Sequence, residues 1–210
     1  MKKNKAYLFD FDGTLVDTME GFADIAGEVI NRFHPEMSFE KARRRYLDTS
    51  GVPFFQQLEI IFPGDETNKE KAGVFEERKK EGFFSTKFSD EVKSTLNSLR
   101  SGGFIIGVCS NNFQELIDRF VDTGGLEFDI VLGFKQGFEK GKDHFDFVMK
   151  EFSLSKEELT FVGDSLKDAQ KALANDIKFI GICNIFSRED FLNIDGSILT
   201  IQSIKELLSL

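Results

Sequence analysis

The chain has 210 residues, of which 40% are hydrophobic and 30% charged, a composition typical of a folded globular protein rather than a disordered one. Its net charge of −9 argues against nucleic acid or an anionic membrane surface as a partner. Two isolated cysteines, Cys109 and Cys183, predict reduced thiols, and no signal peptide or membrane span is apparent, so we expect a cytoplasmic protein with no obligate protein partner.

The first element is a short apolar run, Lys5 to Phe9, that ends in Asp10 and Asp12, followed by Gly13 and Thr14. The run predicts a strand, and if strand geometry continues, residues two apart project to the same side of its carboxyl end. Two crowded carboxylates repel each other unless a cation lies between them or one is protonated. This edge is where open α/β sheets bind ligands. The pattern suggests a hard divalent ion beside a reactive carboxylate, and the alternative is a polar turn.

Residues 18–88 show helical patterns and no strand alternation. These patterns cover Glu20 to Phe33, Ser38 to Thr49, Phe54 to Phe62 and Asn68 to Gly82. We interpret the segment as an all-helical domain inserted after the first strand. The core domain would then comprise residues 1–17 and 89–210, with hinges near Asp17 and Phe88.

After this insert, strand-like runs alternate with helical patterns. The strand-like runs are Phe104 to Cys109, Ile130 to Gly133, Leu159 to Val162 and Phe179 to Ile182, and the helical patterns are Phe113 to Thr123, His144 to Phe152 and Lys167 to Asn175. A short last helix is expected over Ser203 to Leu210. Alternation at this spacing predicts a Rossmann-like, doubly wound α/β fold with a parallel sheet.

Polar residues follow the second strand, where Ser110, Asn111 and Asn112 precede a helix. A hydroxyl group and exposed backbone amides at such a position form an anion site. The alternative is that Asn111 or Asn112 simply caps the helix.

Two lysines, Lys140 and Lys142, lie in the loop before the helix that starts near His144. A lysine that reached a carboxylate cluster would neutralise a phosphoryl oxygen and keep a nucleophilic carboxylate ionised. Either lysine could serve, although loop lysines are normally solvated.

The fourth strand ends in Gly163 and Asp164, and Asp168 follows one helical turn later. Residues four apart on a helix lie on one face, so Asp164 and Asp168 can face the same point. Gly163 allows a sharp turn of the backbone. The alternative is a turn in which Asp164 caps the helix.

Taken together, these segments resemble the haloacid dehalogenase superfamily of phosphatases, and the resemblance extends along the whole chain. The four motifs are Asp10-Phe11-Asp12-Gly13-Thr14, Ser110-Asn111, Lys140 or Lys142, and Gly163 to Asp168. The helical insert resembles the small (C1-type) cap of phosphoglycolate-phosphatase-like members.

The resemblance implies roles for the acidic residues. Asp10 would be the nucleophile that forms an aspartyl-phosphate, and Asp12 the general acid and then the base. Mg²⁺ would be held by the Asp10 carboxylate, the Asp12 backbone carbonyl and the Asp164 carboxylate, with Asp168 orienting this shell.

The resemblance also implies which residues bind the phosphoryl group. Its oxygens would contact Ser110, the Asn111 amide, Gly13 and a lysine, while Thr14 would support the first loop by hydrogen bonding. Lys140 followed by Gly141 resembles the Lys-Gly version of the third motif, so Lys140 is favoured and Lys142 is the alternative.

In the helical insert, the loop from Thr49 to Pro53 resembles the Gly-x-Pro loop of small-capped relatives, which makes Gly51 and Pro53 candidate substrate contacts. The cluster Arg43 to Arg45 is interpreted as a solvated face; an arginine that pointed inward would imply an acidic substrate. His34 and His144 are expected to be capping or surface residues.

The function expected from this resemblance is Mg²⁺-dependent hydrolysis of phosphate monoesters. The substrate would be a small phosphorylated metabolite, such as a phosphoglycolate-like acid, a sugar phosphate or a nucleotide. One alternative is a phosphosugar mutase of the same fold. Another is a non-enzymatic, receiver-like regulator that responds to phosphate, although receivers lack a long helical insert after the first strand.

Overall fold

The computed structural model describes residues 4–210, which form two compact units. One unit, here called the core unit, contains the chain up to Val16 together with Phe88–Leu210. The other, the helical unit, is Asp17–Lys87. The helical unit is therefore inserted into the core unit after its first strand.

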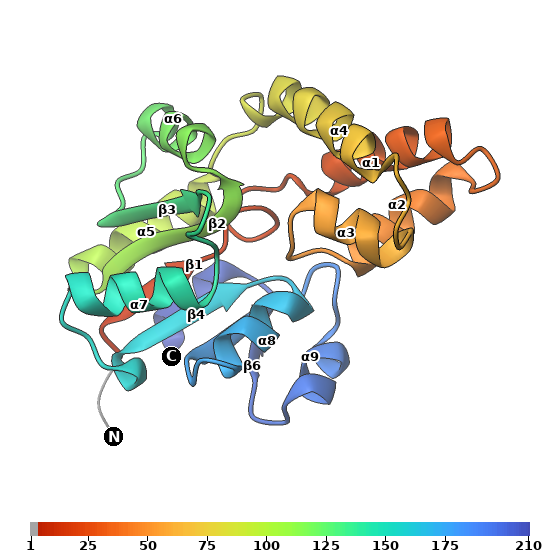
Figure 1. The fold of residues 1–210 in the computed structure, drawn as a ribbon. Helices are drawn as coiled ribbons and strands as arrows, with labels where there is room; N and C mark the ends of the chain where they lie inside the picture. The colour runs from red at the N-terminus through yellow and green to blue at the C-terminus, as the bar shows by residue number, and fades with distance from the viewer. Residues whose placement is uncertain (1–3) are drawn as a thin grey trace. The chain divides into compact units, whose positions relative to one another are not determined.

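The core unit is built on a six-stranded sheet in which each paired strand runs parallel to its neighbour, in the order β3-β2-β1-β4-β5-β6 (Figure 1). The strands are β1 (Ala6–Phe9), β2 (Ile105–Phe113), β3 (Ile130–Phe134), β4 (Leu159–Gly163), β5 (Lys178–Ile182) and β6 (Leu199–Ile201). From β1 the chain adds β2 and β3 toward one edge of the sheet, and then β4, β5 and β6 toward the other edge. The boundary between β1 and β4 is therefore the topological switch point, where doubly wound sheets bind ligands. The predicted α/β fold class is confirmed.

Helices cover both faces of this sheet. The helices of the core unit are α5 (Asp90–Ser101), α6 (Gln114–Gly124), α7 (Lys142–Glu151), α8 (Leu166–Leu173) and α9 (Arg188–Ile194), with 3₁₀ turns η1 (Lys156–Glu158) and η2 (Ile204–Ser209). Phe145 of α7 and Phe191 of α9 belong to one buried cluster with Leu8 and Phe161 of the sheet. Helix α5 contacts β2 and η2 and lies on the opposite side of the sheet from α7 (Figure 1).

Alternation along β1 explains why the strand is apolar throughout. Ala6 and Leu8 belong to the cluster beneath α7 and α8, whereas the ring of Tyr7 packs against those of Phe9 and Phe104. A strand covered on both faces needs apolar side chains at every position. The chain places nonpolar residues there, and the polar groups begin only where the strand ends.

The helical unit contains α1 (Met19–Phe33), α2 (Phe39–Asp48), α3 (Phe54–Ile61) and α4 (Asn68–Phe83). Its interior is aromatic: the ring centroids of Phe54 and Phe75 are 4.1 Å apart, and Tyr46 packs against both rings. Ser38 caps α2, with its hydroxyl accepting a hydrogen bond from the backbone N–H of Lys41. Such a cap contributes about 1 kcal/mol to helix stability.

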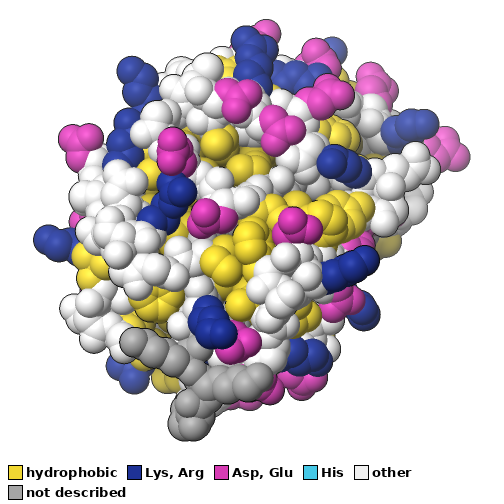
Figure 2. All heavy atoms as spheres, turned by 90° about the vertical axis from the view of Figure 1, so that its left-hand side faces the viewer, with side chains coloured by type: hydrophobic (Ala, Val, Ile, Leu, Met, Phe, Trp, Pro, Cys, Tyr) yellow, Lys and Arg dark blue, Asp and Glu magenta, His cyan; other side chains and the backbone are white. Residues whose placement is uncertain are grey.

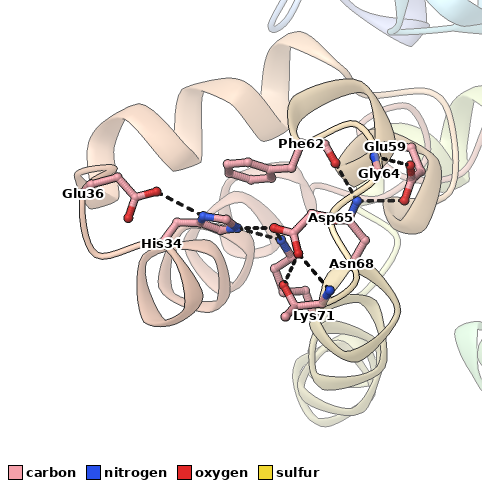
Figure 3. A network of polar contacts seen from close by, with 9 residues as sticks. His34, Glu36, Glu59, Phe62, Gly64, Asp65, Asn68 and Lys71 are labelled. Carbon is pink, nitrogen blue, oxygen red and sulfur yellow. Dashed lines mark hydrogen bonds and ion pairs between the residues drawn. The ribbon is translucent and has the colours of Figure 1, made fainter.

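A polar cluster joins three segments of the helical unit (Figure 3). The Nζ atom of Lys71, whose side chain is fully buried on α4, lies 3.0 Å from Asp65 Oδ2 and 2.8 Å from His34 Nε2. The His34 ring stacks on Phe62 with 3.9 Å between ring centroids. These contacts tie the end of α1 to the turn before α4, and His34 is the C-cap residue of α1.

The surface carries interspersed charges of both signs on the face drawn in Figure 2, with hydrophobic side chains between them. In the helical unit, Arg43 pairs with Glu20 and Asp24, and Arg44 Nε lies 2.8 Å from Asp48 Oδ1. No helix among residues 4–210 is long and apolar enough to cross a membrane.

Candidate active site

The loop after β1 positions the first motif. Strand β1 ends at Phe9, and the carbonyl oxygen of Phe11 accepts hydrogen bonds from the N–H groups of Leu15 and Val16. Strand alternation therefore does not continue through Asp12, and the two carboxylates have different partners. Gly13 has a φ of +78°, which glycine adopts without steric cost.

Asp10 forms an ion pair with a buried lysine from another segment. Lys140 Nζ lies 2.7 Å from Asp10 Oδ1 and 2.7 Å from Asp168 Oδ1, and these side chains are at most 8% exposed. Lys142, two residues later, is exposed and pairs with Asp146 one turn along α7. The structure thus brings Lys140, and not Lys142, to the carboxylates.

Three aspartates converge at the carboxyl ends of β1 and β4. Asp10, Asp164 and Asp168 each offer a carboxylate oxygen, and these oxygens lie within 4.8 Å of one another. Thr14 Oγ1 donates to Asp164 Oδ1 at 3.4 Å, which joins the first loop to the end of β4. Ser165, and not Asp164, caps α8 by accepting from the Asp168 N–H. The carboxylate of Asp164 is therefore not used as a helix cap.

Gly163 is required by the close approach of Asp168. A Cβ atom built on Gly163 would lie 2.9 Å from Asp168 Oδ2 and 3.0 Å from its Cβ. Ser165 Oγ donates to the same Oδ2 at 2.7 Å, which holds this carboxylate in place. The side chain of Asp168 is therefore fixed from three sides, by Ser165, Lys140 and the backbone of Gly163.

The electrostatics of the cluster reflect its burial. Burial raises the pKa of Asp10 to about 7, although Lys140 acts to lower it. Burial, followed by the charges of Asp10 and Asp168, raises the pKa of Asp164 well above its usual range. Burial lowers the pKa of Lys140, but the carboxylates of Asp10 and Asp168 outweigh this effect, so its pKa is raised. Lys140 therefore remains charged, and it faces more carboxylates than it can neutralise.

The donor set fits a hard divalent cation. The three converging side chains present only oxygen atoms, the ligands that Mg²⁺ and Ca²⁺ prefer. Asp164 Oδ2 is fully buried, and within residues 4–210 no protein group donates a hydrogen bond to it. A cation at this point would satisfy that oxygen and relieve the repulsion among the carboxylates.

Strand β2 brings the second motif to the same edge of the sheet. Contrary to the capping alternative, Asn111 and Asn112 do not cap α6, because β2 extends to Phe113 and the helix begins at Gln114. The register with β3 shifts between Cys109 and Phe113, so this segment departs from regular pairing. Ser110 is buried, and its Oγ accepts from the Asn112 N–H at 3.1 Å.

Two contacts to the first loop were missed by sequence reasoning. Asn112 Nδ2 donates to Asp12 Oδ2 at 2.6 Å, and Asn184 Nδ2, from the segment after β5, donates to the Gly13 carbonyl at 2.8 Å. Both join residues more than 90 positions apart, so no local pattern could have revealed them. The expectation that His144 is a capping or surface residue was wrong: its side chain is fully buried, with Nδ1 3.2 Å from Cys109 Sγ on β2.

Comparisons with known proteins place the chain in a family. The model of the haloacid dehalogenase-like hydrolase family matches residues 7–182, which include the segments that carry Asp10, Ser110, Lys140 and Asp164. The chain belongs to the haloacid dehalogenase-like hydrolase family. The proposed resemblance to this superfamily is thereby confirmed.

Individual relatives of this haloacid dehalogenase-like hydrolase are distant but span most of the chain. The phosphoglycolate phosphatase of Nitrosospira multiformis is 28% identical over 188 residues, which cover 81% of this chain and 79% of the relative. That of Photorhabdus laumondii is 25% identical over 225 residues, covering 100% and 93%. A haloacid dehalogenase-like hydrolase from Streptococcus pneumoniae has the same fold, with a TM-score of 0.82 at 17% identity, covering 100% of this chain and 99% of that one.

In the helical unit of this hydrolase, the segment Thr49 to Pro53 forms an ordered turn before α3. Gly51 has a φ of +91°, and Pro53 is the residue before the first turn of α3. Gln57 braces the turn, since its Nε2 donates to the Val52 carbonyl at 3.1 Å and its Oε1 accepts from Thr49 Oγ1 at 3.0 Å. The loop is therefore held by its own unit, and its contact with substrate remains a prediction.

Proposed function

We propose that this hydrolase cleaves phosphate monoesters of small metabolites, with Asp10 as the nucleophile. The observation that carries the proposal is the convergence of Asp10, Asp164 and Asp168 around Lys140 at the switch point of the sheet. A buried lysine beside a buried carboxylate stabilises the ionised form that a nucleophile needs. The phosphoglycolate phosphatases among its relatives support the same reaction class.

The first half of the proposed reaction uses the first motif. An Asp10 oxygen attacks phosphorus, the bond to the ester oxygen breaks, and Asp12 gives its proton to the departing alkoxide. Lys140, Ser110, Gly13 and the Asn111 amide would hold the phosphoryl oxygens. In-line displacement needs the acid on the side opposite the nucleophile, which is consistent with the separate partners of Asp10 and Asp12.

The second half returns the free enzyme. Asp12, now ionised, takes a proton from a water molecule, whose oxygen attacks the phosphorus of the aspartyl-phosphate. The bond between phosphorus and Asp10 breaks, and inorganic phosphate leaves. Each residue ends in its starting protonation state.

We assign the metal to Asp10, the backbone carbonyl of Asp12 and Asp164, and the ion to Mg²⁺, because the set is small, anionic and oxygen-only. When bound, Mg²⁺ would neutralise charge on the carboxylates and the phosphoryl group. Asp168 would act through Lys140 and the neighbouring carboxylates rather than on the substrate.

Hydrolysis of p-nitrophenyl phosphate by the wild type and by Asp10→Asn, with and without Mg²⁺, tests this function. We expect Mg²⁺-dependent turnover by the wild type and loss of nearly all activity in the variant. Asp122→Asn, an exposed aspartate of α6, provides a matched control and should keep wild-type rates. Equal rates for the wild type and Asp10→Asn would rule out the assigned nucleophile.

A panel of phosphorylated metabolites, with 2-phosphoglycolate first because of the relatives' activity, would define the substrate. Adding a hexose 1-phosphate and measuring both isomer and free phosphate separates a hydrolase from a phosphosugar mutase. Release of phosphate without isomer is the result that we expect. A lack of turnover on every substrate would instead favour a non-enzymatic regulator.

A further inference from the structure

We propose that Asn112 is a positioning residue that aims the Asp12 carboxyl group at the leaving-group oxygen of the substrate. The inference rests on the proposed function, because it needs Asp12 to act as the general acid. It concerns a residue that lies outside the motifs assigned from the sequence. Asn112 itself does not contact the transferred phosphoryl group in this proposal.

The geometry of Asn112 connects two parts of the site. Asn112 is 4% exposed, and its Nδ2 donates to Asp12 Oδ2 at 2.6 Å. Its backbone N–H donates to Ser110 Oγ at 3.1 Å. One residue thus holds the proposed acid with its side chain and the proposed phosphate-binding hydroxyl with its main chain.

The chemistry of an amide makes this contact directional. Nδ2 of asparagine can only donate, so it orients one carboxyl oxygen of Asp12, Oδ2, as the acceptor. In this proposal the other oxygen, Oδ1, carries the proton that passes to the leaving group. Asp12 is half-buried in a loop after the end of β1, where a carboxyl group without such a contact would sample more rotamers.

Asn112 lies in the irregular end of β2. The register between β2 and β3 shifts between Cys109 and Phe113, and within this segment Ser110 and Asn112 are both buried while Asn111 is partly exposed. Residues two apart in a strand share a face, and Asn112 thereby reaches Asp12 in the loop after β1. Misplacing a catalytic group by even a small distance is costly, since proton transfer needs hydrogen-bond geometry.

The test uses leaving groups that differ in their need for a proton. p-Nitrophenolate leaves as a stable anion, whereas an alkoxide needs protonation as the bond breaks. We compare kcat/KM for p-nitrophenyl phosphate with that for the best alkyl phosphate substrate of the wild type. The variants are Asn112→Ala, which removes the donor, and Asn112→Asp, which keeps the size but places a second carboxylate against Asp12.

For the alkyl phosphate, we expect Asn112→Ala to lower kcat/KM about tenfold to a hundredfold, because misplacing a catalytic group by about 1 Å can cost roughly a hundredfold in rate. Asn112→Asp should lower it further. For p-nitrophenyl phosphate the loss should stay below about threefold, because that step does not depend on the acid. In the background of Asp12→Asn, Asn112→Ala should cause no additional selective loss.

Folding is checked by thermal unfolding of each variant, with Asn175→Ala as a matched control. Asn175 Nδ2 donates to the Lys171 carbonyl at 2.8 Å, so this control loses the same kind of hydrogen bond without touching the first loop. An equal loss for both substrates, or no loss, would overturn the role of Asn112. A wild type inactive toward both esters would overturn the proposed function and this inference with it.

Discussion

Cys109 Sγ on β2 and His144 Nδ1 on α7 lie 3.2 Å apart, and both side chains are fully buried. Burial raises the pKa of the Cys109 thiol to about 12. Burial, followed by the charge of Lys140, lowers the pKa of His144 to about 4. The pair is therefore neutral at physiological pH and adds no charge beneath the aspartate cluster.

The neutral state of His144 predicts a pH dependence of stability. The folded pKa, about 4, lies below the ordinary 6.5, so the unfolded chain binds more protons between these values. This contribution to the free energy of unfolding is present above pH 6.5 and is lost as the pH falls to about 4; it amounts to roughly 3 kcal/mol at most.

Urea unfolding of the wild type and of His144→Gln, at pH 7 and at pH 4.5, measures this contribution. The free energy of unfolding should fall more for the wild type than for the variant between these pH values. The variant should be the less stable protein at pH 7, because it also loses the contact with Cys109. Parallel pH profiles for the two proteins would contradict the assignment.

The contrast between Lys140 and Lys142 predicts opposite outcomes for two similar substitutions. Lys140→Met should lower kcat at least a hundredfold, since charge stabilisation of the transferred group is a large part of phosphoryl-transfer catalysis. Lys142→Met should leave activity within about twofold, because an exposed ion pair contributes little. Steady-state kinetics with p-nitrophenyl phosphate compares the two variants. Comparable losses of kcat would contradict the assignment of Lys140, rather than Lys142, to the site.

Removing a proposed metal ligand predicts a change in metal dependence. Asp164→Asn should raise the Mg²⁺ concentration needed for half-maximal activity by at least tenfold, since it removes a negatively charged oxygen ligand. Asp146→Asn, an exposed aspartate on α7, is the matched control. Titration of metal-free protein with Mg²⁺, followed by calorimetry and by activity, gives both values. An unchanged Mg²⁺ requirement would exclude Asp164 as a ligand.

The cluster of His34, Asp65 and Lys71 predicts where the helical unit is vulnerable (Figure 3). Lys71→Met removes the buried cation that contacts both Asp65 and His34, and it should cost about 1–3 kcal/mol of unfolding free energy. Lys69→Met, an exposed neighbour on α4, should cost almost nothing. Limited proteolysis within residues 17–87, together with thermal unfolding, measures both effects. Equal protease sensitivity of the two variants would show that the cluster does not stabilise this unit.

Much of the fold could be predicted because periodicity and burial agree. The strands that are apolar throughout stood out, and the helical patterns of the insert match α1 to α4 within one or two residues at each end. Helix α5 was missed although Val92, Leu96 and Leu99 have helical spacing and are buried. Strand β6 has three residues, and Leu199 at its start is exposed, so it carries too little pattern to detect.

The site also contains some residues that the sequence could predict and others that it could not. Asp10, Ser110, Lys140 and Asp164 could be nominated because each follows a strand or precedes a helix, which is a local signal. The contact between Asn112 and Asp12 could not, because it joins residues 100 positions apart and leaves no local signal. Lys140 was favoured over Lys142 from the resemblance of Lys140-Gly141 to the Lys-Gly motif, and the structure shows Lys140 paired with Asp10 and Lys142 paired with Asp146.

The strands that lead to the proposed site residues Ser110, Asp10 and Asp164 are β2, β1 and β4, which are interior strands, while β3 and β6 form the two edges of the sheet. Local unfolding of a sheet starts at its edge strands, and β1 is an interior strand in which every residue is buried. Amide exchange with deuterated solvent should therefore be slowest along Ala6–Phe9. The proposed site residues therefore follow the strands that are expected to unfold locally last.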